Sequence, residues 1–187
     1  PQELRYVLPV FMQTARKLQQ KYPNLIVYIP SCRKVFDVKF KIALDKYKVK
    51  GKIISQKDIE ELKTYVYSLT KLALCKSGTV NMELALYNIP QIVGYRVSRV
   101  TAFIGKKLLN FKVKFISPVN LLLKKLIIPE FVQKEFKARN IYEKACKILD
   151  RKSEKAKIFK GYALLKKELG QEGVVKRAAE EIFNSLI

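Results

Sequence analysis

Short apolar runs rich in β-branched residues recur along this sequence, and longer segments with helical periodicity separate them. Continuous apolarity over four or five residues is typical of a strand that is buried on both faces. The runs occupy residues 25–29, 53–54, 72–75, 92–95 and 113–116. Strands that alternate with helices predict βα units around a parallel sheet, so the pattern indicates an α/β fold with a doubly wound parallel sheet.

The segments around these runs have the three- and four-residue spacing of amphipathic helices. A first helix is expected from Leu4 to about Tyr22, and later ones at 33–48, 57–68, 79–88 and 98–110. From about Pro129 onward the strands are expected to stop and helices to close the fold, at 129–137, 139–149, 153–169 and 174–186. No linker rich in Gly, Ser or Pro divides the chain, so residues 1–187 are predicted to form one domain.

The net charge of the chain indicates which classes of partner it can bind. Lys and Arg number 38 against 16 Asp and Glu, a net charge of +22, which favours polyanions, anionic membranes or phosphorylated ligands. There is no histidine, so catalysis within the chain would rest on carboxylates, lysines or substrate positioning, and no metal site is predicted. Three cysteines without a close pair argue against a disulfide framework and predict a reducing compartment.

The most informative stretch is the turn that leaves the apolar run at 72–75 and enters the helix expected at 79–88. At the carboxyl end of a parallel strand such a turn faces the ligand crevice, and Ser77, Gly78 and Thr79 offer a close backbone approach to a phosphate. Thr79 and Glu83 are four residues apart and share a helix face, which places a carboxylate within reach of a sugar diol. The alternative is that Ser77 or Thr79 caps the helix and Glu83 is solvated.

A basic and apolar stretch follows this turn. No acidic residue occurs between Glu83 and Glu130, whereas lysines and arginines are interleaved with leucines and phenylalanines. That texture is typical of contact with a membrane surface, although a solvated basic face would look similar. The lysines expected to face the membrane are Lys106, Lys107, Lys112 and Lys114.

An ordered series of motifs closely resembles the carboxyl-terminal half of the lipid-A-disaccharide synthase family. The start, Pro1 to Tyr6, looks like the continuation of that family's Gly-Ser-Arg loop, cut just after the Arg. The residues within these motifs are most similar to those of the branch found in oxygenic photosynthetic bacteria and plastids. The further motifs are Lys76-Ser77-Gly78-Thr79 with Glu83 and Leu84, Pro90, Tyr95-Arg96, Thr101, Ser117-Pro118 with Asn120, Pro129-Glu130 and Gln133, and Gly170 to Gly173 with Arg177-Ala178-Ala179.

The resemblance implies the Rossmann-like C-terminal lobe of a GT-B glycosyltransferase, a metal-independent and inverting enzyme without a cofactor. The family moves 2,3-diacylglucosamine from UDP to 2,3-diacylglucosamine 1-phosphate. By this resemblance the chain is the nucleotide-sugar donor-binding domain, and the first strand, the acceptor lobe and the catalytic base are missing, so the chain alone is not expected to turn over. The residues implied for the donor or UDP are Ser77, Gly78, Thr79, Glu83, Glu3 and Arg96; those implied for the cleft are Asn120, Glu130 and Gln133.

The partners implied by the resemblance are UDP-diacylglucosamine, the acylated glucosamine 1-phosphate acceptor and an anionic membrane surface. No nucleic-acid partner is implied, and homodimer formation is left open. The expected location is the cytoplasm or the plastid stroma, peripheral at a membrane. Two alternatives remain: another GT-B transferase with a different UDP-sugar, and a basic binding module for membrane or nucleic acid whose affinity would fall steeply with salt and ignore UDP.

Overall fold

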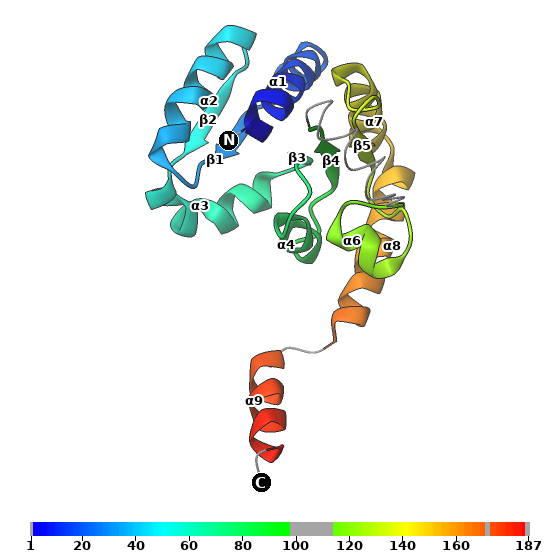
Figure 1. The fold of residues 1–187 in the computed structure, drawn as a ribbon. Helices are drawn as coiled ribbons and strands as arrows, with labels where there is room; N and C mark the ends of the chain where they lie inside the picture. Colours follow the sequence, from blue (N-terminus) through cyan, green and yellow to red (C-terminus); the bar gives the residue numbers. More distant parts are fainter. Residues whose placement is uncertain (1, 98–113, 171–172, 186–187) are drawn as a thin grey trace.

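The computed structural model describes residues 2–97, 114–170 and 173–185 (Figure 1). Predicted helices within these ranges are confirmed except at 129–137, and the one expected at 98–110 lies outside them. The strands are β1 (Val27–Pro30), β2 (Gly51–Ile54), β3 (Ala73–Cys75), β4 (Gln91–Tyr95) and β5 (Glu130–Val132). The helices are α1 (Gln2–Lys21), α2 (Lys34–Tyr47), α3 (Gln56–Leu69), α4 (Val80–Leu86), α6 (Pro118–Leu123), α7 (Ala138–Asp150), α8 (Lys152–Leu169) and α9 (Val174–Asn184).

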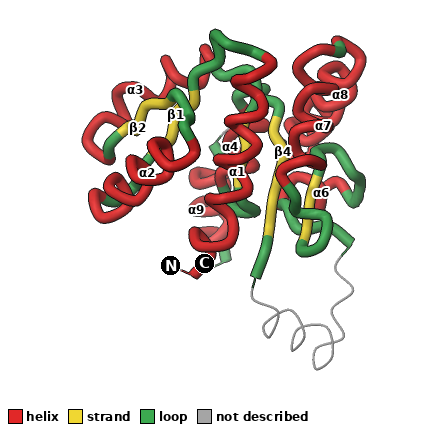
Figure 2. The backbone as a smooth tube through the Cα atoms, turned by 90° about the horizontal axis from the view of Figure 1, so that it is seen from above, coloured by secondary structure: helices red, strands yellow, loops and turns green. Residues whose placement is uncertain are grey.

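All strand pairs in these ranges are parallel, which confirms the predicted α/β class, but the strands form two sheets. One sheet pairs β1 with β2, and the other has the order β3-β4-β5. Figure 2 shows the β1–β2 layer between α2 and α3, as expected when helices cover both faces of a parallel sheet. Among the described residues no ladder joins β1 to β3, so the sheet is not continuous there.

Helix α1 connects the two sheets. Leu8, Met12 and Ala15 pack with the apolar residues of the β1–β2 side, whereas Val10 and Leu18 belong to the core around β4. Both groups of residues have helical spacing, so this one helix packs against two hydrophobic cores. In Figure 1 α1 lies between α2 and α7, and it contacts both of them.

Strand β4 is the centre of the second sheet. Its residues Gln91 to Gly94 are buried, as expected of a strand with a neighbour on each side and helices above and below. In the register Cys75 pairs with Val93, and Val93 pairs with Glu130. The last residue of β3 and the first of β5 therefore lie level with each other on either side of β4.

Two predictions in this region are wrong. The segment expected as a helix at 129–137 contains β5 and a turn, and residues 114–116 of the strand expected at 113–116 are not in a strand. Residues 130–132 form a strand because they pair with β4, and a strand of three residues is too short to show a hydrophobic period in the sequence. In the second case the amide of Ile116 donates to the Glu130 carboxylate instead of to a strand neighbour.

The C-terminal helices pack on the second sheet, with the exception of α9. Tyr162 of α8 is fully buried, and Gly161 beside it lets the side chain of Ile127 approach. Figure 1 shows α9 apart from the other helices, and its Ile182 and Phe183 are exposed. No helix in the described ranges is long and apolar enough to span a bilayer.

The connection between α7 and α8 is predicted to lose stability in acid. Glu154 accepts from Lys144 Nζ at 2.7 Å and Lys157 Nζ at 3.1 Å, and these lysines, Lys144 above all, lower the pKa of its carboxyl to about 2. Because the folded-state pKa lies below the ordinary 4.5, this contribution is complete above pH 4.5 and disappears as the pH falls toward 2.

The Glu154→Gln variant should therefore have a lower free energy of unfolding than the parent chain at neutral pH, and the two values should approach each other below pH 3. Urea unfolding followed by circular dichroism measures both values. A difference that does not change with pH would contradict this role of Glu154.

Candidate functional site

The turn from β3 into α4 is held by Asn81 rather than by the two residues considered as caps. Asn81 Oδ1 accepts from the Gly78 amide at 2.9 Å, whereas the Thr79 side chain makes no cap hydrogen bond. The Ser77 hydroxyl donates to the Ile116 carbonyl instead. The capping alternative for Ser77 and Thr79 is therefore wrong, and the turn has its own side-chain support.

A fully buried polar network lies beneath the turn. Asn81 Nδ2 donates to Gln91 Oε1 at 2.9 Å, and Gln91 Nε2 donates to the Asn81 carbonyl at 2.9 Å and to the Tyr162 hydroxyl at 3.1 Å. The Tyr162 hydroxyl then donates to the Ile89 carbonyl at 3.0 Å. Burial raises the pKa of Tyr162 and raises the pKa of the neighbouring Cys75 to about 12, so both stay protonated at neutral pH. The network fixes the turn from below without a charged group.

The outer side of the turn is open. A Cβ atom built on Gly78 would meet no atom within 4 Å, and Thr79 is exposed. The amides of Thr79 and Val80 donate to no acceptor in the part of the chain that the structure describes. Open space beside unsatisfied amides is an arrangement that accepts an anion.

Glu83 lies on α4 one turn beyond Thr79 and is not directed into the apolar interior. The Glu83 amide donates to the Thr79 carbonyl at 3.4 Å, which confirms that the two residues are helical neighbours. The side chain of Glu83 is 33% exposed and forms an ion pair with Lys63 of α3. Tyr67 lies beside this pair, and its own burial, with a smaller effect from Glu83, raises the pKa of its hydroxyl.

Glu130 fastens the chain before α6 to the sheet. Its carboxylate accepts from the amides of Ile116 at 2.8 Å and Ser117 at 2.9 Å, and from Asn120 Nδ2 at 2.7 Å. Because Glu130 lies level with Cys75 across β4, this contact also places the Ile116 carbonyl where the Ser77 hydroxyl reaches it. Glu130 thus positions Ser77 through Ile116.

Asn120, which the resemblance places in a cleft, is fully buried, and its side chain forms hydrogen bonds with backbone groups. Its Oδ1 accepts from the amides of Ile127 at 2.8 Å and Ile128 at 3.0 Å, and its Nδ2 also donates to the Ile128 carbonyl at 2.8 Å. In this structure Asn120 therefore shapes the loop after α6, and any effect of the residue on a ligand would pass through Glu130.

The Glu130→Gln variant should lose about 2 kcal/mol of stability, because an amide NH₂ group would replace one of the two carboxylate oxygens and leave a backbone amide without an acceptor. Urea unfolding followed by circular dichroism measures this loss. Glu143→Gln is the matched control, since Glu143 is exposed and pairs with Arg139 on the surface, where such a pair contributes little. Equal losses in the two variants would contradict the role of Glu130.

Arg96 and Gln133 meet at the carboxyl ends of β4 and β5. Arg96 Nη2 donates to the carbonyls of Gln133 at 3.1 Å and Phe136 at 2.6 Å, and its guanidinium lies 5.5 Å from the Phe136 ring centroid. Gly94 permits this docking, because a Cβ there would overlap the ring of Phe136. Arg96 is therefore committed, at least through this nitrogen, to the turn at 133–136.

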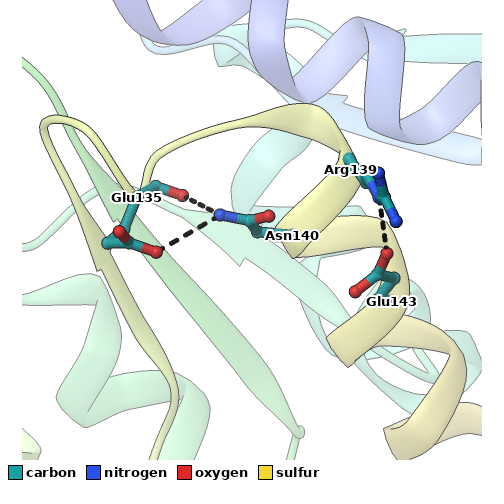
Figure 3. Close-up of polar contacts among 4 residues, drawn as sticks. All are labelled: Glu135, Arg139, Asn140 and Glu143. Carbon is teal, nitrogen blue, oxygen red and sulfur yellow. Dashed lines mark hydrogen bonds and ion pairs between the residues drawn. The ribbon is translucent and has the colours of Figure 1, made fainter.

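The same turn is held on its other side by the start of α7. Asn140 Nδ2 donates to the Glu135 carbonyl at 2.9 Å and to its carboxylate at 3.4 Å, as Figure 3 shows. Arg139 and Glu143, four residues apart on α7, form a surface ion pair at 2.8 Å. The turn is thus fixed between β4 and α7.

Five of the predicted residues form two groups beside the β3-β4-β5 sheet, and Gly78, Thr79 and Glu83 lie on the turn from β3 and on α4. Ser77, Asn120 and Glu130 share a hydrogen-bond network, and Arg96 and Gln133 form the second group. The sequence analysis missed Asn81 and Gln91; the only signal was an asparagine three residues after Gly78, the spacing at which a side chain in the first helical turn reaches back to the amide before the helix, as in a capping box.

For four further predicted residues the structure does not describe the side chain. Glu3 lies in α1, with its side chain outside what is described, and Lys106, Lys107 and Lys112 lie outside the described ranges. Lys114 is exposed, and its Nζ lies 5.5 Å from the Phe115 ring centroid.

Parallel sheets with helices on both faces and polar turns at their carboxyl edge define a Rossmann-like α/β domain. Residues 1–184 match the family profile described as lipid-A-disaccharide synthetase. The chain belongs to the lipid-A-disaccharide synthase family, whose members are glycosyltransferases.

Individual relatives agree with this assignment. The chain is 43% identical over 183 residues to lipid-A-disaccharide synthase of Prochlorococcus marinus (strain MIT 9313), covering 98% of this chain and 47% of the relative. It is 36% identical to the synthase of Gloeothece citriformis (98% and 46% covered) and 35% identical to that of Synechocystis sp. (97% and 45% covered). These organisms belong to the oxygenic photosynthetic bacteria that the motif wording indicated. The chain spans about half the length of the curated relatives that it matches.

Proposed function

We propose that this chain is the donor-binding lobe of a GT-B lipid-A-disaccharide synthase. The observation that carries the proposal is the family match, which extends over residues 1–184 and corresponds to less than half of each relative. The reaction proposed is an inverting transfer of 2,3-diacylglucosamine from UDP to 2,3-diacylglucosamine 1-phosphate, with release of UDP. The acceptor site and the base belong to the part of the relatives that this chain does not match.

The donor nucleotide is assigned to the edge formed by the turn from β3 into α4. The UDP diphosphate lies against the open side of Gly78, where the amides of Thr79 and Val80 are available. The ribose hydroxyls bind Glu83, which exchanges its ion pair with Lys63 for them. Fixed amides that face a departing diphosphate stabilise the charge that develops on it, which is how this edge would assist transfer. The lysines at 106, 107, 112 and 114 remain the residues proposed to lie near the membrane.

Isothermal titration calorimetry with the 187-residue chain tests the proposal. UDP should bind, CMP should bind more weakly, and acylated UDP-glucosamine should bind better than UDP-N-acetylglucosamine. Better binding of the plain sugar nucleotide would replace the lipid assignment with another UDP-sugar transferase. Binding to polyanions that falls steeply with salt and is indifferent to UDP would favour a basic binding module.

A further inference from the structure

Helix α2 carries an apolar stripe that is exposed and packs on no other helix or strand in the part of the chain that the structure describes. Val35, Val38 and Ile42 are 61%, 64% and 59% exposed, although their spacing of three and four residues gives them a common face. The opposite face of the helix, with Phe40, Ala43 and Leu44, is buried in the core. An ordinary surface helix carries polar residues where this stripe lies, so the stripe needs a separate explanation.

Exposed lysines flank the stripe on both sides. With about 100° per residue, Lys39 and Lys46 fall on one side of the stripe and Lys34 and Lys41 on the other. The α2 segment has two acids: Asp45 is exposed, and Asp37 accepts from the Ser31 hydroxyl at the start of the helix. Asp45 falls on the side of Lys34 and Lys41, so the border of the stripe carries four lysines against one acid and is positive overall.

We propose that this face of α2 docks on an anionic lipid bilayer. The three aliphatic side chains would enter the boundary between headgroups and acyl chains, and the long lysine side chains would extend to the lipid phosphates on either side. Lysine is depleted in protein–protein interfaces, and this face has no aromatic platform on which bases of a single strand could stack. The composition thus fits a bilayer better than a protein or a nucleic acid.

The proposed surface is separate from the proposed nucleotide site. Helix α2 packs on α1 and β2, whereas the site lies on β3, β4 and their turns. Figure 1 shows α2 at the outer edge of the molecule, with α1 and β2 on its inner side. Lipid binding by α2 is therefore independent of UDP binding, and either proposal can fail without the other.

Tryptophan fluorescence reports directly on this face, because the chain has no tryptophan. In the Val38→Trp variant the emission should move to shorter wavelength on adding vesicles of phosphatidylcholine with phosphatidylglycerol. The matched control is Leu164→Trp on α8, whose leucine is also exposed (43%) and whose emission should not move. A shift in both variants or in neither would overturn the proposal. So would a shift that appears without vesicles as protein concentration rises, because a second copy of the chain would then cover the stripe.

Vesicle sedimentation separates this docking from the general attraction of a chain with +22 charge. The Val35→Ser, Val38→Ser, Ile42→Ser triple variant keeps every charge and should bind the anionic vesicles on the order of tenfold more weakly. The Lys39→Glu, Lys41→Glu pair should weaken binding more than Lys160→Glu, Lys167→Glu on α8. Unchanged binding of the triple variant, or equal effects of the two lysine pairs, would overturn the proposal.

Discussion

The Gly78→Val substitution should abolish UDP binding while leaving the free energy of unfolding within about 0.5 kcal/mol of the parent value. A Cβ at this position meets no atom within 4 Å, and Gly78 does not have the left-handed backbone that only glycine tolerates easily. The folded chain therefore has room for the larger side chain. The diphosphate, however, is proposed to occupy this space, and losing two hydrogen bonds to a charged group weakens binding at least about a hundredfold.

Calorimetry with UDP and urea unfolding measure the two quantities on the same preparation. Gly94→Ala is the informative contrast, because a Cβ there overlaps the ring of Phe136 and should lower stability by about 2 kcal/mol. The two glycines thus separate a substitution that fills ligand space from one that fills core space. If Gly78→Val bound UDP as well as the parent chain, the diphosphate would have to lie elsewhere.

Local hydrophobic patterns in the sequence were sufficient to predict most of the helices and strands. Amphipathic helices such as α1 and α7 bury one face, so apolar residues recur every three or four positions in their sequences. Strand β4 could be predicted because it is buried on both faces and is apolar over several residues. Strand β5 could not, because its three residues are a strand only through pairing with β4. The division into two sheets is likewise invisible locally, since it depends on which strands become neighbours.

The candidate site shows the same boundary between local and long-range information. The Ser77-Gly78-Thr79 turn and its relation to Glu83 follow from a strand, a glycine and a helix in succession, all within one short stretch. The support from Glu130 does not follow locally: Glu130 is linked to Ser77 through Ile116, and these residues come from three separate segments. Buried polar groups must be hydrogen-bonded, but the partners are set by tertiary contacts.

The Glu83→Gln substitution should weaken UDP binding by about ten- to a hundredfold, because a carboxylate that accepts from two ribose hydroxyls is replaced by a neutral amide. Stability should change by less than about 1 kcal/mol, since the pair with Lys63 is partly exposed. Calorimetry and urea unfolding again provide the two measurements. Lys63→Met is the matched control, because it breaks the same ion pair from the other side while the carboxylate remains.

The two variants distinguish a ligand-binding carboxylate from a structural one. If Glu83 served only to join α3 to α4, both substitutions would shift UDP affinity equally and through stability alone. If it binds the ribose, Lys63→Met frees the carboxylate and should leave UDP affinity unchanged or improve it. A UDP analogue without the 2′- and 3′-hydroxyls completes the test: it should bind the parent chain and Glu83→Gln equally, because the groups that Glu83 recognises are absent from it. Should the analogue still discriminate between them, the carboxylate would act on another part of the nucleotide.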